Sequence, residues 1–182
     1  MKMDWAKLLS AVEPHGARQI IAGFAASMDQ CVARAELTSH MRLAHFIAQC
    51  AHESDGFRTT VEYASGNAYE GRKDLGNTHV GDGRRFRGRG LIQLTGRANY
   101  TSFGAALGVA NPALQDAPGK AAEFPLAALM AAEFWARHKI NVVADRDDVP
   151  AVTRIINGGQ NGLADRIRRT TAAKKALASA GV

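Results

Sequence analysis

Apolar residues recur at spacings of three and four along the first third of the chain, the period of a helix with one buried face. This pattern predicts helices over residues 5–12, 20–32 and about 40–54. Asp4 precedes the first helix and Thr38 or Ser39 the third, and short polar side chains at such positions cap free backbone N–H groups. Gly56 is a natural stop for the third helix, because glycine readily adopts the conformation that ends helices.

The second half of the chain shows the same period. It predicts helices over residues 97–107, 126–135, 148–156 and 163–179. The last helix is expected to bury a face that carries Leu163, Ile167, Thr170 and Leu177. Residues 91–95 are short and apolar enough for an extended strand, on which Gln93 and Thr95 would share one face.

Residues 55–90 show neither the spacing of three and four that is typical of a helix nor the alternation that is typical of a strand. The segment contains eight glycines, seven arginine or lysine residues and five acidic residues. A compact protein rarely keeps so long an irregular segment unless it is functional. We therefore expect it to form the wall of a substrate cleft, with a small hairpin or helical turns.

Composition supports a mainly helical protein of 182 residues with enough apolar material for a core, since 46% of the residues are hydrophobic and 22% are charged. The net charge of +6 favours an anionic partner, and it is equally compatible with an ordinary basic protein that has no such partner. No apolar run is long enough to span a membrane, and Asp4 and Lys7 interrupt what would otherwise be a signal peptide. Cys31 and Cys50 lack metal-ligand spacing and are expected to be small buried residues.

The helix over residues 40–54 ends in His52-Glu53-Ser54, and this is the first candidate for chemistry. At about 100° per residue, Glu53 lies beside Phe46 and Cys50 at the edge of the apolar stripe. Apolar neighbours raise the pKa of a carboxyl group, which suits a general acid. Helix geometry alone leaves a solvated glutamate at a fraying helix end as the alternative.

A His-Glu pair also begins the zinc-binding motif HExxH, but the second histidine would have to stand at position 56, which is Gly56. We therefore predict no metal site here. A general acid that takes part in hydrolysis commonly works with a second carboxylate, which activates water or attacks directly. Five candidates lie in the irregular segment, and chemistry alone does not choose among them: Asp55, Glu62, Glu70, Asp74 and Asp82.

Three separated motifs give the chain a resemblance to glycoside hydrolase family 19. They are His52-Glu53-Ser54, Gly88-Arg89-Gly90-Leu91-Ile92-Gln93-Leu94-Thr95-Gly96-Arg97-Ala98-Asn99-Tyr100 and Ile156-Asn157-Gly158-Gly159-Gln160-Asn161-Gly162. The resemblance covers roughly residues 40–170. Within this range, Ala64–Asn77 is similar to the corresponding segment of the phage endolysin and bacterial branch of the family. Three motifs in the right order are more specific than any one of them.

The resemblance implies a mainly α, lysozyme-like fold with two lobes and a deep substrate cleft, in one catalytic domain over residues 1–182. It also implies an inverting mechanism without a cofactor. Glu53 corresponds to the general acid. Glu62, nine residues later, corresponds to the general base of the bacterial members. In the plant enzymes the base lies further along the chain, so Glu70 remains the alternative candidate for the general base.

Other residues correspond to the family's substrate site. Thr95 matches a serine or threonine that holds the attacking water, and Arg166 matches an arginine that supports the surroundings of the acid. Gln93, Asn99 and Asn157 match substrate-contacting positions. Ala98 stands where an aromatic residue often precedes the motif's asparagine, and the disulfide cysteines of the plant chitinases are absent.

Four functions are compatible with parts of this pattern. The first is an endolysin that cuts the β-1,4 bonds of peptidoglycan as a monomer, waiting in the host cytoplasm until a holin opens the membrane. The second is a chitinase acting on N-acetylglucosamine polymers. A nucleic-acid-binding protein is disfavoured because few aromatic residues accompany the arginines, and a non-cutting glycan binder is disfavoured by the intact Glu53 and Glu62.

Overall fold

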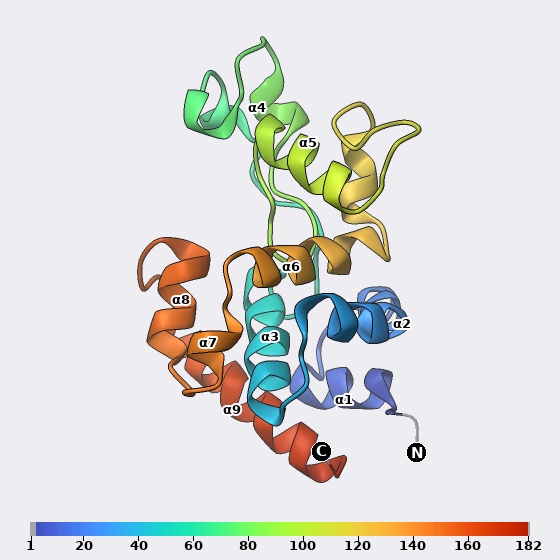
Figure 1. Cartoon of the computed structure of the whole chain (residues 1–182), viewed down its shortest axis with the longest axis vertical. Coiled ribbons are helices and arrows are strands. Elements are labelled where there is room, and N and C mark those ends of the chain that lie inside the picture. The colour runs from blue at the N-terminus through green and yellow to red at the C-terminus, as the bar shows by residue number, and fades with distance from the viewer. Residues whose placement is uncertain (1–2, 182) are drawn as a thin grey trace.

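The computed structural model describes residues 3–181, and its helices form two lobes (Figure 1). The larger lobe contains α1 (Trp5–Val12), α2 (Arg18–Ala35), α3 (His40–Glu53), α6 (Leu126–Arg137), α7 (Asn141–Ala144), α8 (Val149–Asn157) and α9 (Leu163–Ser179). The smaller lobe contains η1 (Asn67–Tyr69), η2 (Lys73–Leu75), α4 (Asp82–Arg85), α5 (Arg97–Ala106) and η3 (Pro118–Ala122). Extended pairing among the described residues is limited to isolated bridges. The mainly helical fold is therefore confirmed, while the deep cleft stays a prediction.

The predicted starts of the first and third helices agree closely with the structure, because their caps form, whereas the helix predicted over 20–32 extends over Arg18–Ala35. The Asp4 carboxylate accepts a hydrogen bond from the Lys7 backbone N–H at 3.0 Å, and α1 begins directly after it. Ser39, rather than Thr38, caps α3 by accepting a bond from the Arg42 N–H at 3.2 Å. Short polar residues satisfy N–H groups that lack partners within the helix.

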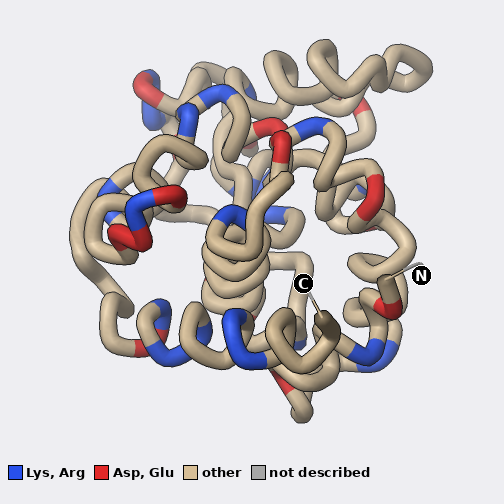
Figure 2. Tube along the Cα trace, turned by 60° about the horizontal axis from the view of Figure 1, so that its bottom comes forward, with Lys and Arg blue, Asp and Glu red and all other residues tan. Residues whose placement is uncertain are grey.

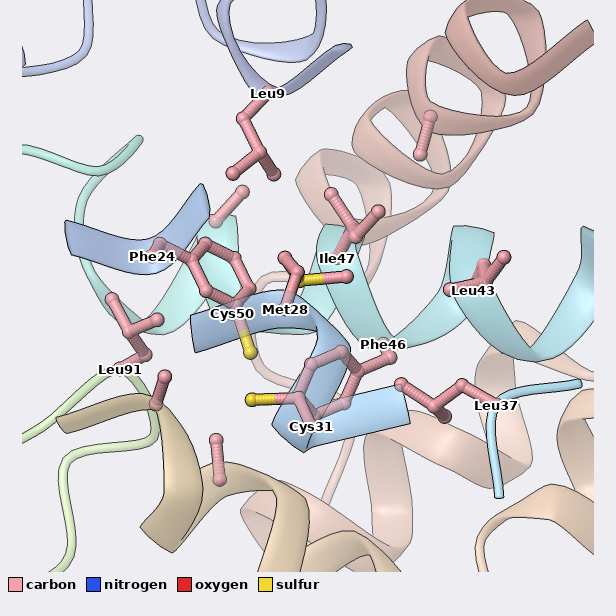
Figure 3. Packing of buried hydrophobic residues seen from close by; sticks show 14 of the residues in the cluster. Leu9, Phe24, Met28, Cys31, Leu37, Leu43, Phe46, Ile47, Cys50 and Leu91 are labelled. Carbon is pink, nitrogen blue, oxygen red and sulfur yellow. The ribbon is translucent and has the colours of Figure 1, made fainter. Parts of the chain in front are cut away.

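The core of the larger lobe surrounds α3, in which every residue from Leu43 to Ala51 is buried. Figure 3 shows side chains of α2 and α3 packed between Leu9 of α1 and Leu91. Cys31 and Cys50 are both free and buried in this core, as predicted. Burial raises the pKa of the Cys31 thiol to about 12, so both cysteines act as apolar packing groups.

A second core holds the smaller lobe together. It consists of Phe86, Leu94, Tyr100, Phe103, Leu114, Ala121 and Met130. Phe86 and Tyr100 meet edge to face with ring centroids 5.3 Å apart. Met130 belongs to α6, whose Ala128 and Ala131 lie in the larger core, so α6 joins the two lobes.

Two local predictions are wrong. Residues 91–95 form turns rather than a strand, and Gln93 has a left-handed φ of 54°. Leu91 and Ile92 enter the larger core whereas Leu94 enters the smaller one, so the chain must reverse between them. Gln93 and Thr95 therefore do not share a strand face.

The buried face of α9 also differs from the prediction. Thr170 and Leu177 are buried as predicted, but Ile167 is 45% exposed, and the helix also buries Arg166, Arg169 and Ala173. Two arginines take the place of apolar residues because they form ion pairs with acidic residues of the larger lobe. Among residues 3–181, no helix has the length and apolar character needed for a membrane span.

Candidate active site

Glu53 is the last residue of α3, and Arg166 of α9 lies against it. Arg166 Nη2 donates a hydrogen bond of 2.5 Å to Glu53 Oε1. The Arg166 side chain is only 1% exposed and that of Glu53 is 18% exposed, so this ion pair is largely removed from water. Besides the apolar neighbours expected from the sequence, the Glu53 carboxyl group therefore has a buried cation against it.

Gln49, one helical turn before Glu53, fixes the other side of the Arg166 guanidinium. Its Oε1 accepts a hydrogen bond from Arg166 Nη1, while Arg166 Nε donates to the Asn161 carbonyl at 3.2 Å. Sequence reasoning missed Gln49. Its position four residues before the acid, on the same face of a helix, was the signal that could have identified it.

A second set of ion pairs fixes the end of α3 to the start of α9. His52 Nδ1 lies 2.6 Å from Asp165 Oδ2, and Asp165 also accepts a hydrogen bond of 2.6 Å from Arg169 Nε. Although burial opposes it, hydrogen bonds from Arg169 and His52 hold the pKa of Asp165 well below its usual range. A Cβ at Gly162 would lie 2.3 Å from the His52 ring, so only glycine allows this approach. The backbone that carries Glu53 is therefore rigidly held.

Glu62 is held by the smaller lobe. Its Oε1 accepts a hydrogen bond from the Tyr69 hydroxyl at 2.8 Å, and its Oε2 accepts one from the Gly88 N–H at 2.9 Å. Burial, together with this bond to Glu62, raises the pKa of Tyr69 to about 12, so its hydroxyl remains a donor at neutral pH. Tyr69 was not identified from the sequence, which contains no periodic signal there.

Gln93 lies beside Glu62. A Cβ placed on Gly88 would be 2.9 Å from Gln93 Oε1 and 3.1 Å from Glu62 Oε2, so the two side chains meet at this glycine. Gln93 Nε2 donates to the Gly90 carbonyl at 3.1 Å, whereas its Oε1 is buried without a hydrogen-bond partner. An acceptor left free beside a carboxylate is suited to bind a water or a sugar hydroxyl.

Thr95 and Asn99 continue this arrangement. The Thr95 hydroxyl donates to the Gln93 carbonyl at 2.9 Å, and Asn99 Nδ2 donates to the Thr95 carbonyl at 2.8 Å. The structure thus joins Gln93, Thr95 and Asn99 in one chain of hydrogen bonds near Glu62.

Asn157 is separate from this group. It is exposed at the C-terminal end of α8, and no hydrogen bond from its side chain to another described residue is formed. The loop that follows it reaches Gly162 and hence His52, beside Glu53. Its substrate contact stays a prediction.

Glu70, the alternative candidate for the general base, has a structural role. Its two carboxylate oxygens accept hydrogen bonds from the N–H groups of Gly81 at 2.7 Å and Gly83 at 2.8 Å. These residues begin α4, so Glu70 anchors that helix. Asp82 is likewise engaged, because hydrogen bonds from Arg97 lower its pKa to about 2.

Tyr63 connects the two segments that carry the glutamates. Its hydroxyl donates a hydrogen bond of 3.0 Å to Asp55 Oδ2, two residues after Glu53, and Tyr63 itself follows Glu62. Its ring is 77% exposed. Within the described residues, no group of three or more histidine, cysteine or acidic side chains is arranged to hold a metal ion.

Comparison with known proteins gives this arrangement a context. A family model described as glycoside hydrolase family 19, chitinase class I, matches residues 15–166. A glycosyl hydrolase family 19 domain-containing protein of Haemophilus influenzae is 30% identical over 186 residues, covering 85% of this chain and 88% of the relative.

Solved structures support the fold. Chitinase C from Streptomyces griseus HUT6037 superposes with a TM-score of 0.70 at 20% identity, covering 97% of this chain and 78% of that one. A class IV chitinase from Zea mays reaches 0.65 at 19% identity, covering 94% and 85%. The family model and the relative from Haemophilus influenzae define a glycoside hydrolase. The chain belongs to glycoside hydrolase family 19.

Proposed function

We propose that this chain is a lysozyme-type endolysin that hydrolyses the β-1,4 glycosidic bonds of peptidoglycan with inversion of configuration. The observation that carries the proposal is the separate support of two glutamates. Glu53 is paired with Arg166 of the larger lobe, while Glu62 is held by Tyr69 and Gly88 of the smaller lobe. Two carboxylates on different supports can act on opposite sides of one bond.

In this mechanism Glu53 is the general acid. It gives its proton to the glycosidic oxygen as the bond between that oxygen and the anomeric carbon breaks. Glu53 then carries a negative charge. Arg166 Nη2, 2.5 Å from Glu53 Oε1, stabilises the charge that appears during this step.

Glu62 is the general base. A water molecule attacks the anomeric carbon from the face opposite the leaving group, and its proton passes to Glu62. The Tyr69 hydroxyl and the Gly88 N–H fix the direction of the carboxylate. We assign Gln93 Oε1, which is free to accept a hydrogen bond, and Thr95 to holding the water, and Asn99 and Asn157 to contacts with the sugar.

The choice of peptidoglycan over chitin rests on charge. The net charge of +6 suits an anionic wall polymer better than a neutral one. Chitinase activity is the second candidate, since the superposed proteins are described as chitinases. We further propose that the chain acts as one catalytic domain and as a monomer, without cofactor, nucleic acid or membrane anchor, and that it waits in the host cytoplasm for release through a holin.

The test is a comparison of products. Purified peptidoglycan and a chitin oligomer are digested in parallel, and the released fragments are identified by mass spectrometry. Muropeptides ending in a reducing N-acetylmuramic acid, formed much faster than chitin fragments, support the proposal. Faster release of N-acetylglucosamine oligomers from chitin assigns the chain to the second candidate.

A further inference from the structure

The smaller lobe contains a dense set of arginines around the segment that supports Glu62. Five lie between positions 84 and 97: Arg84, Arg85, Arg87, Arg89 and Arg97. Four of them donate hydrogen bonds within the lobe, to the Asn67 side chain, the Asp82 carboxylate, the Tyr100 hydroxyl or backbone carbonyls. Acidic and basic positions are interspersed along the chain, as the coloured trace in Figure 2 shows.

Arg87 is different. Its guanidinium makes no hydrogen bond or ion pair with any residue from 3 to 181, and its Nε is buried without a partner. The side chain is half-buried, and its remaining nitrogens reach solvent. A partly buried guanidinium without an acceptor is costly in a folded protein, which points to an acceptor that arrives from outside.

The position of Arg87 connects it to the proposed base. It directly precedes Gly88, whose N–H holds Glu62 Oε2 at 2.9 Å. A Cβ on Gly66 would lie 2.8 Å from the Arg87 Cβ, so Arg87 packs beside η1, which carries Tyr69. The Arg87 backbone is also fixed, because its carbonyl accepts a hydrogen bond of 2.7 Å from the Tyr100 hydroxyl.

We propose that Arg87 is a specificity residue that binds a carboxylate carried by the sugar substituents of peptidoglycan. A guanidinium binds a carboxylate with two parallel hydrogen bonds, a geometry that a neutral glycan cannot supply. Peptidoglycan offers the carboxyls of its stem peptides and, on N-acetylmuramic acid residues without a stem peptide, the lactyl carboxyl, and chitin has neither. The inference rests on the proposed peptidoglycan activity.

The experiment compares Arg87→Gln and Arg87→Lys with the wild type on three substrates. The first is intact peptidoglycan. The second is glycan from which an amidase has removed the stem peptides, leaving free lactyl carboxylates. The third is the same glycan with its carboxyls converted to methylamides, so that sugar, linkage and length stay constant.

Arg146→Gln is the matched control, because Arg146 is exposed in the larger lobe without a partner in the described chain and its loss changes the net charge equally. We expect Arg87→Gln to lose about tenfold or more in kcat/KM on carboxylate-bearing glycan. Its activity on the methylamide should stay within about twofold of the wild type, and Arg87→Lys should keep part of the activity. Arg146→Gln should match the wild type throughout. Thermal melting of each variant verifies folding.

The outcomes separate this inference from the proposed function. A loss on the denuded glycan supports recognition of the lactyl carboxylate, which is free only there, and a loss on intact peptidoglycan supports recognition of a stem-peptide carboxylate. An equal loss on the methylamide, or no loss on any substrate, overturns the role of Arg87 while the peptidoglycan activity stands. If the wild type fails to cut peptidoglycan but cuts chitin, both proposals are overturned.

Discussion

Replacing Gly88 with alanine should remove most of the activity while leaving the fold intact. The added Cβ would lie 2.9 Å from Gln93 Oε1, 3.1 Å from Glu62 Oε2 and 3.3 Å from Glu62 Cβ. The φ of Gly88 is outside the left-handed region, so alanine fits the backbone itself. The two neighbouring side chains must therefore move, and both belong to the proposed water-activating group.

The size of the effect follows from these contacts. Relief requires the Gln93 amide and the Glu62 carboxylate to give way by a few tenths of an ångström. Because a misplacement of about 1 Å costs on the order of 100-fold in rate, we expect a loss of about tenfold. The bond of 2.9 Å from the Gly88 N–H to Glu62 would weaken with this shift. A hydrogen bond to a charged group contributes about 1.5–3 kcal/mol, and each kcal/mol corresponds to roughly 2–4 °C in a protein of this size, so Tm should fall by no more than about 12 °C.

The assay is kcat on peptidoglycan together with a thermal melt. Gly119→Ala is the control, because nothing lies within 4 Å of a Cβ at this exposed glycine and its φ is also ordinary. It should keep both activity and Tm. If Gly88→Ala keeps the wild-type kcat, the reasoning is refuted, because the function of Glu62 would then not depend on its close contact with Gly88.

Three further predictions follow from the same geometry. Glu53→Gln should lose at least about 100-fold in kcat without unfolding, because the amide cannot donate the proton, and retained lytic activity would refute its role as acid. Glu62→Gln should be similarly impaired, whereas Glu70→Gln should mainly lower Tm, because Glu70 anchors two N–H groups of α4. The opposite order of damage would transfer the role of base to Glu70. Asp82, which is 1% exposed, has a folded-state pKa of about 2, below its ordinary value of 3.8, so its contribution is present above about pH 4 and is lost as the pH falls through 2. Urea unfolding as a function of pH should show this loss in the wild type and a flatter curve in Asp82→Asn.

The helices could be predicted from the sequence because their apolar period and their caps are local. Asp4 and Ser39 lie directly before the helices that they cap. Residues 91–95 could not be predicted in this way, because Leu91 and Leu94 enter different cores. The packing of the two lobes imposes this turn, and the five residues themselves contain no sequence pattern that predicts it.

The candidate site was predictable in part. Motifs alone assigned Glu53, Glu62 and Arg166, and the structure brings Glu53 and Arg166 together across 113 positions of sequence. The apolar pattern of α9 misplaced Ile167, because it treated arginine as a surface residue and did not anticipate buried ion pairs. Tyr69 was missed because its role depends on the fold of an irregular segment.

The central claim is that Glu53 and Glu62 act as an acid and a base on opposite faces of one sugar, and the anomer of the first product tests it most directly. An inverting pair stands about 6.5–9.5 Å apart and leaves room for water, whereas a retaining pair stands at about 5–5.5 Å and forms a covalent intermediate. Proton NMR of a fresh digest reads the anomer before mutarotation mixes it. The account predicts that cleavage of the β-linked glycan first yields the α-anomer. An initial β-anomer, or a sugar adduct trapped on Glu62, would contradict it.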